Sequence, residues 1–371
     1  MKKIFLIVVL ILIPLFTYAS DYDSYIEKII EDTDMSELDS YTNKSEYGYF
    51  SFKDNVKSFS KGKEVLNAKK ILNTVIKIFF KNVNESLSFT MRIIAAAILG
   101  GIVLNLKNSF GKSESGEAAF YVCLSIICGY GIKAFSQAAS IANDTVISIT
   151  AFMNTLIPTL MSVTAAGGKA ATAVSIHPVM FAATAVITSL IGKIIMPLIY
   201  VYAATKITNS FVEGINLGKI GDVIFSVIKW GSGIILTIFG GITAIYASVM
   251  PNVDAVTLKT AHFAVGNFIP VVGGILSDSV DMVIACSELL KNAVGISGLI
   301  GIIVICFYPA VKIMADAVML NIASALIGTI SDKRITNAVA SLAKSMTLLF
   351  SMMVTVTAML VIMLAFVVSM V

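Results

Sequence analysis

Three acidic residues in the last third of the chain are the side chains best placed to do chemistry. Asp278, Asp281 and Glu288 lie between long apolar runs. On a helix of 3.6 residues per turn they fall on one face with Ser277 and Asn292. Because unpaired carboxylates persist in a membrane only against protein or water, we predict that the three acids line a wet pore or a groove between subunits. The alternative is a helix on the membrane surface, with the acids in solvent.

A helix break is predicted just before these acids. Asn267 and Pro270 are followed closely by Gly273 and Gly274. Proline lacks an N–H and disfavours helix at the residue before it, and a glycine pair lets the backbone turn. We expect one helix to end near Asn267 and the next to begin near Ser277. Interrupted helices of this kind recur at transport sites.

A second candidate break lies earlier in the chain, at Pro158 with Gly167 and Gly168. The same arguments apply to it, and a kink at Pro158 in a continuous helix is the alternative.

A charged turn is predicted before the final apolar run, at a face of the membrane. It is formed by Asp332, Lys333 and Arg334. Upstream of it, Lys312 and Asp316 are four residues apart and able to pair on one helix.

Motifs that resemble those of enzymes and metal sites lack residues that such sites require. Gly111-Lys112-Ser113 resembles part of a phosphate loop, but Leu106 stands where that loop needs its first glycine. The two histidines, His177 and His262, are far apart, and the four cysteines lie in apolar runs, where buried thiols are expected. We predict no enzymatic activity, no metal and no cofactor.

Composition indicates a membrane protein. Of 371 residues, 57% are hydrophobic and 13% charged, about half the charge of a typical soluble domain. Residues 21–86 hold 22 of the 50 charged residues, so a short polar segment precedes a long apolar one. The net charge of +4 is too small and dispersed for a nucleic-acid surface.

The N-terminus has the features of a secretory signal. Lys2 and Lys3 precede an apolar run that ends before Ala19 and Asp21. We predict a cleaved signal peptide at residues 1–19, with an uncleaved anchor helix as the alternative. An exported segment of residues 20–86 would follow, including an amphipathic helix near residues 65–80, and then a polytopic domain of residues 87–371.

The fold class predicted for that domain is all-α, with about seven transmembrane helices, give or take one or two. Uncharged runs long enough for a bilayer core are residues 145–168, 170–192, 230–253, 292–311 and 345–371. Shorter or interrupted candidates are residues 93–106, 118–140, 194–205 and 260–277. Glycines stud several of these runs and are expected to let helices pack closely.

Several motifs resemble one known family, the stage III sporulation protein AE of endospore-forming bacteria. The resemblance spans roughly residues 90–371 and includes Pro158 with Gly167-Gly168. Its motifs are Thr257–Thr260, Phe263–Gly274, Leu276–Asp278, Leu290–Gly295, Tyr308–Ala310 and Ser331–Ile335.

The resemblance implies a subunit of a channel built in the mother-cell membrane around the forespore and needed for late forespore development. Implied partners are other membrane and ring-forming proteins of the same sporulation operon, a cytoplasmic ATPase and a forespore partner across the intermembrane space. The N-terminal segment would face that space. A self-contained secondary transporter for a small solute is the alternative.

Overall fold

The computed structural model describes residues 30, 33, 35–43, 51–61, 68–109, 114–211, 217–249 and 273–369. The described residues form helices and turns without a strand, so the predicted all-α class is confirmed. The helices are α3 (Ser36–Asn43), α4 (Phe52–Ser60), α5 (Ala68–Ser109), α6 (Glu114–Ala166), α7 (Ala170–Leu190), the π-helix η1 (Ile191–Ile195), α8 (Met196–Thr208), α9 (Gly218–Val249), α11 (Gly273–Gly328) and α12 (Lys333–Ser369).

Within these residues, six helices are long and apolar enough to cross a membrane, a number inside the predicted range. Runs 118–140 and 145–168 both belong to α6, because Asn143 and Asp144 separate the two runs without interrupting the helix. Runs 170–192 and 194–205 form one rod in the same way, through α7, η1 and α8. The run 260–277 lies mostly outside the described residues.

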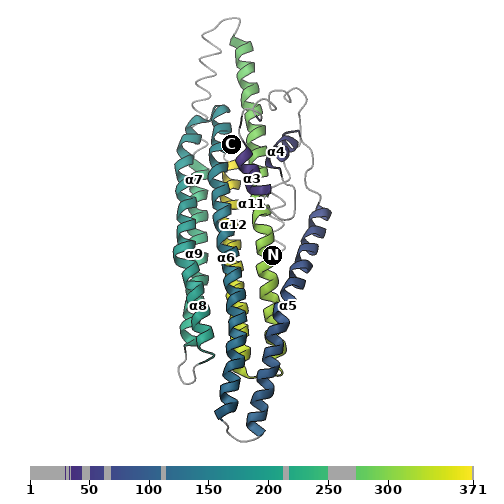
Figure 1. Cartoon of the computed structure of the whole chain (residues 1–371). Helices are drawn as coiled ribbons and strands as arrows, with labels where there is room; N and C mark the ends of the chain where they lie inside the picture. Colours follow the sequence, from purple (N-terminus) through teal and green to yellow (C-terminus); the bar gives the residue numbers. More distant parts are fainter. Residues whose placement is uncertain are drawn as a thin grey trace.

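The six long helices stand side by side and alternate in direction (Figure 1). At one end, here called the hairpin end, α5, α8 and α11 finish and α6, α9 and α12 begin. The α6–α7 turn and the last residues of α12 lie at the opposite end. At 1.5 Å per residue, the 56 residues of α11 span about 84 Å, against about 30 Å for a bilayer core. The bundle therefore extends well beyond one bilayer.

Two glycines of α11, Gly298 and Gly301, bring the central helices into close contact. A Cβ on Gly298 would meet Leu156 of α6 at 2.5 Å and Leu364 of α12 at 3.0 Å. A Cβ on Gly301 would lie 2.6 Å from Phe152. The prediction of close glycine packing is confirmed here and at Gly100 and Gly101 of α5, but it is wrong for α9. A Cβ added to any of the four α9 glycines in run 230–253 would meet nothing within 4 Å: Gly231, Gly233, Gly240 and Gly241.

The two short helices α3 and α4 pack on the α6 and α11 side of the bundle (Figure 1). The fully buried ring of Phe52 lies 6.1 Å from that of Phe152, and the ring of Tyr41 lies 6.5 Å from it. The Asp39 carboxylate fastens α3 to α4 by accepting from the backbone N–H groups of Phe52 and Lys53. Part of the polar N-terminal segment, α3 and α4, is thus packed into the bundle.

The helix α5 joins the amphipathic segment to the first apolar run without a break. It begins at Ala68, inside the predicted amphipathic helix, and ends at Ser109. The domain boundary placed after residue 86 therefore falls within a continuous helix. The predicted signal peptide, residues 1–19, lies outside the described residues.

Candidate functional site

The uncharged runs of the sequence lie at one level of the bundle. Gly298 of α11 lies between Leu156 of α6 and Leu364 of α12. This contact places runs 145–168, 292–311 and 345–371 at the same level. The hydroxyls of Thr150 and Thr188 are 2.9 Å apart, which adds run 170–192. Run 230–253 joins them because α7, α9 and α12 line one apolar cavity. These five runs together form a layer about one bilayer core thick, here called the slab, which crosses α6, α7, α9, α11 and α12.

One side of this slab is apolar throughout. Residues 170–192, in α7 and the start of η1, and 230–249 of α9 contain no Asp, Glu, Lys or Arg. Their outward side chains are large and aliphatic or aromatic, and Val174 is 76% exposed. Others of this kind are Phe181, Val186, Ile234, Ile238, Ile242 and Ile245. Such a surface is suited to lipid.

The α4 and α5 side of the bundle is polar by contrast. Phe52 packs against Phe152, which abuts Gly301, so α4 lies at the level of the uncharged runs. Yet the outward side chains of α4 include exposed charges: Lys53, Asp54 and Lys57. The N-terminal part of α5 also exposes charges, at Lys77, Lys81, Glu85 and Arg92, together with large apolar side chains such as Phe80 and Met91. Because lipid does not tolerate the exposed charges of α4 at this depth, α4 requires water or a protein partner.

A charged cleft of about 550 Å³ lies on the same polar side, between α5, α6 and α11. It adjoins the slab, since Lys312 directly follows run 292–311. Two of its walls are joined where the buried Ser86 hydroxyl of α5 donates to the Asp316 carboxylate of α11. The charged and amide residues that line the cleft are Asn82, Glu85, Arg92, Lys133, Gln137, Lys312 and Asp316.

The cleft brings three cations and two carboxylates together. Arg92, Lys133 and Glu85 are exposed, whereas Lys312 and Asp316 are half-buried. Their mixed signs suit a water-filled passage or the docking of a polar segment, because each charge can be solvated or paired there. Its lining contains no Ser–His or Cys–His pair for nucleophilic catalysis among the described residues.

Of the predicted acidic stripe, the structure gives the surroundings of one side chain. The Glu288 carboxylate accepts from Lys169 Nζ at 2.8 Å, and 46% of its side chain is exposed. Lys169 lies just before α7, so the ion pair ties α11 to the α6–α7 turn. Asp278 and Asp281 lie on α11, but their side chains are outside the described residues.

Only the glycines of the first candidate break lie within the described residues. Asn267 and Pro270 are outside the described residues, and Gly273 and Gly274 are the first two residues of α11, which begins four residues before the predicted Ser277.

At the second candidate break, the helix ends at the glycine pair and continues through the proline. The helix α6 continues through Pro158 to Ala166. Gly167 and Gly168 then form the turn into α7, and Gly168 has φ 79°, a conformation that favours glycine. A helix can continue through a proline because neighbouring groups satisfy the freed carbonyl.

The charged turn between α11 and α12 is held by specific contacts. Asp332 Oδ1 accepts from the Arg334 backbone N–H at 2.7 Å and from its Nε at 3.2 Å. The Arg334 guanidinium lies 4.2 Å from the centre of the Phe120 ring and donates to the Tyr121 hydroxyl. Ser331 Oγ donates to the Ala97 carbonyl of α5 at 3.0 Å. The turn therefore fastens α5, α6 and α12 together at the hairpin end.

Sequence reasoning missed one buried cation. Lys291 is 3% exposed, and its Nζ donates to the Val368 carbonyl at 2.8 Å. Val368 belongs to the last turn of α12, whose carbonyls lack partners within the helix, so the lysine caps that helix. Its sequence signal was Lys291 itself, directly before a twenty-residue uncharged run.

The cysteines and His177 are placed as structural residues. Cys128, Cys286 and Cys306 are buried and Cys123 is half-buried, all four as free thiols, which confirms the prediction of buried thiols in helices. The half-buried ring of His177 lies 5.2 Å from that of Phe181.

These features define a multi-pass helical membrane protein with one apolar side and one polar side. Residues 50–371 match the model of a protein family described as stage III sporulation protein AE. The chain belongs to this family. It is 28% identical over 318 residues to the stage III sporulation protein AE of Bacillus subtilis (strain 168), over 85% of this chain and 80% of that protein. No solved structure matches the chain.

Proposed function

We propose that this chain is a non-enzymatic membrane subunit of a sporulation channel complex that links mother cell and forespore and is needed for late forespore development. Family membership supports the sporulation role. The observation that supports a channel subunit is the polar side of the bundle, where α4, α5 and the charged cleft occupy or adjoin the level of the uncharged runs. A subunit in a multiprotein channel has a reason to present water-compatible and lipid-compatible sides at one depth.

In this proposal the apolar α7 and α9 side faces lipid of the mother-cell membrane. The α4, α5 and cleft side faces a wet lumen or a neighbouring subunit from the same operon. Residues 20–86 are exported: α3 and α4 pack on the bundle, and the rest of the segment faces the intermembrane space and the forespore partner. The hairpin end, where α5 finishes after Lys107, faces the cytoplasm and its ATPase. Asp278, Asp281 and Glu288 extend the same wet surface beyond the slab.

Charge reversal in the cleft tests the proposal. We expect Arg92→Glu combined with Lys133→Glu to reduce spore yield in an endospore-forming host that depends on this chain. The matched control is Lys193→Glu with Lys229→Glu, on exposed residues of η1 and α9 away from the cleft. Normal spore yield from the cleft variant, at wild-type protein level, would count against the role of the cleft.

Co-purification tests the assembly itself. Tagged protein extracted from sporulating cells should bring down other membrane proteins of sporulation, and recovery of the chain alone under mild extraction would contradict the proposal. Solute uptake by the purified chain alone in liposomes would instead support the secondary transporter that the sequence left open.

A further inference from the structure

A small polar cavity lies between α8 and α12, away from the charged cleft. Its volume is about 310 Å³. Three of its residues come from α8 and the turn after it, and the rest follow one stripe of α12. Its polar lining residues are Tyr202, Lys206, Asn209, Asn337, Ser341 and Lys344. None of the described residues that line it carries a carboxylate, but Asp222 borders it and pairs with Lys206, which leaves the positive charge of Lys344 in excess.

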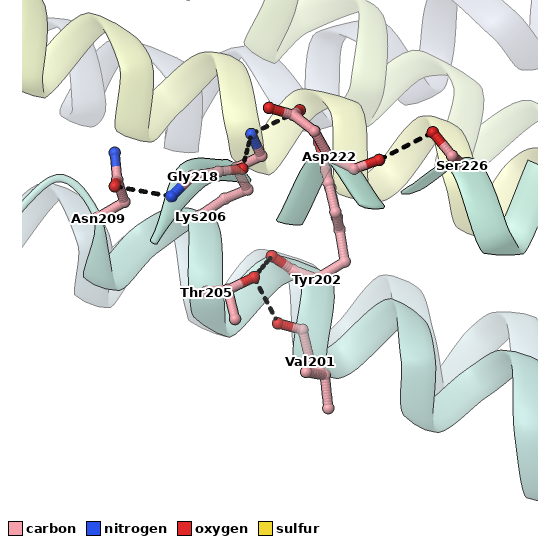
Figure 2. Close-up of polar contacts among 8 residues, drawn as sticks. All are labelled: Val201, Tyr202, Thr205, Lys206, Asn209, Gly218, Asp222 and Ser226. Atoms are coloured by element: carbon pink, nitrogen blue, oxygen red, sulfur yellow. Dashed lines mark hydrogen bonds and ion pairs between the residues drawn. The ribbon is translucent and has the colours of Figure 1, made fainter. Parts of the chain in front are cut away.

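The start of α9 holds two of these residues in place. Figure 2 shows Lys206 Nζ between the Gly218 carbonyl, at 2.8 Å, and the Asp222 carboxylate, at 2.7 Å. Asn209 Oδ1 accepts from the Gly218 backbone N–H at 2.8 Å. An ammonium has three donors, so one N–H of Lys206 remains. The amide oxygen of Asn209 is used, which leaves its NH₂ group as a donor.

A buried hydroxyl provides an independent indication of a ligand. Tyr202 is fully buried, and its OH has no hydrogen-bond partner among the described residues. A buried hydroxyl without a partner is costly, so native structures usually satisfy it. Lys344, across the cavity, places its Nζ 4.6 Å from the centre of the Phe225 ring, which fixes the position of the ammonium.

We propose that this cavity binds an oxyanion of the phosphate type. The remaining N–H of Lys206, the NH₂ group of Asn209, the Tyr202 hydroxyl and the Lys344 ammonium border it, and phosphate oxygens accept bonds from such donors. The group can be a free phosphate or the headgroup of an anionic phospholipid. Exposed apolar side chains on the adjoining helices, Val201 and Val223, would accompany acyl chains in the second case. Basic pockets between membrane helices are known to hold anionic headgroups.

Thermal unfolding of the full chain in neutral detergent tests the proposal. The probes are inorganic phosphate, phosphatidylglycerol and, as the uncharged comparison, phosphatidylcholine. A ligand that binds only the folded state raises the melting temperature with its concentration. A rise with phosphatidylglycerol alone identifies a lipid headgroup, and a rise with phosphate as well identifies the free anion. Either result supports the site.

Two variants connect the effect to the cavity. Tyr202→Phe removes only the unpartnered hydroxyl, so the ligand-free protein should be at least as stable as wild type. We expect Tyr202→Phe and Lys344→Gln each to weaken anion binding about tenfold or more, as for loss of a bond to a charged group. The matched controls, Tyr200→Phe and Lys229→Gln, lie outside the cavity and should bind as wild type does. No anion-dependent rise in wild type, or the same rise in both cavity variants, would overturn the proposal.

Discussion

The same substitution at two glycines should have opposite effects on stability. Gly101 of α5 and Gly241 of α9 are each the second glycine of a Gly-Gly-Ile sequence inside a long helix. A Cβ on Gly101 would lie 2.9 Å from the Ile330 carbonyl oxygen and 3.4 Å from Ser331 Cα. Those atoms belong to the backbone of the α11–α12 turn, which cannot move aside as a side-chain tip can. A Cβ on Gly241 would meet nothing within 4 Å.

The expected magnitudes follow from this difference. Replacing glycine by alanine inside a helix stabilises by about 0.5–1 kcal/mol at either position. Overpacking of a tight contact costs about 1–3 kcal/mol, and only Gly101→Ala incurs it. Because the helical gain is common to both variants, their difference isolates the overpacking cost. Gly101→Ala should therefore be about 1–3 kcal/mol less stable than Gly241→Ala.

Reversible unfolding in mixed detergent micelles measures this difference directly. We expect Gly241→Ala to match or exceed wild type and Gly101→Ala to unfold at a lower denaturant fraction. Equal stability of the two variants would refute the close approach of α5 to the α11–α12 turn.

Three further predictions concern charged contacts. Arg334→Lys should lower the free energy of unfolding by about 1 kcal/mol, because lysine keeps the charge but loses the planar stack on Phe120 and the fork on the turn; detergent unfolding measures this. A double-mutant cycle of Lys169→Met and Glu288→Gln should give a coupling below about 1 kcal/mol, since the carboxylate is 46% exposed, and a larger value would contradict a solvent-screened pair. Lys291→Met should destabilise by about 1–3 kcal/mol and speed amide exchange in the last turn of α12, and unchanged exchange would exclude the capping role.

Much of the fold could be predicted from the sequence because hydrophobicity sets the spans. Apolar runs gave the all-α class and a span number that included the observed one. The error was local: Lys193 separated runs 170–192 and 194–205, but a lysine at the edge of an apolar slab does not end a helix whose hydrogen bonds are internal. Pro158 was likewise open to two interpretations, a helix break or a kink in a continuous helix. The sequence does not reveal whether neighbouring groups satisfy the carbonyl that a proline frees.

The candidate site was less predictable because its partners are distant in sequence. The spacing of Lys312 and Asp316 allows a pair along one helix, but it does not indicate the hydrogen bond that Asp316 takes from Ser86, 230 residues away. In the sequence, Arg92 only borders run 93–106 and Lys133 only interrupts run 118–140. They line one cleft with Lys312 because α5, α6 and α11 pack together, which no local pattern encodes.

The motif Ser331–Ile335 was recognised from the sequence, but its role required the structure. Ser331 bonds to α5, Asp332 caps α12, Arg334 stacks on α6 and Ile335 is fully buried beneath Gly100. Each residue type in the motif thus has a packing or hydrogen-bonding reason.

Cysteine labelling most directly tests whether the two sides of the bundle face different surroundings. In a chain with its four native cysteines replaced by alanine, Lys57→Cys on α4 and Ile238→Cys on α9 should be compared in native membranes opened to both faces. Both side chains are exposed, so neither thiol is shielded within the chain itself. A hydrophilic thiol reagent should label Lys57→Cys in membranes, or after detergent releases a neighbouring subunit that covers it. The same reagent should label Ile238→Cys only after detergent removes lipid. Rapid labelling of Ile238→Cys in intact membranes, or no labelling of Lys57→Cys even in detergent, would contradict a polar side opposite a lipid side.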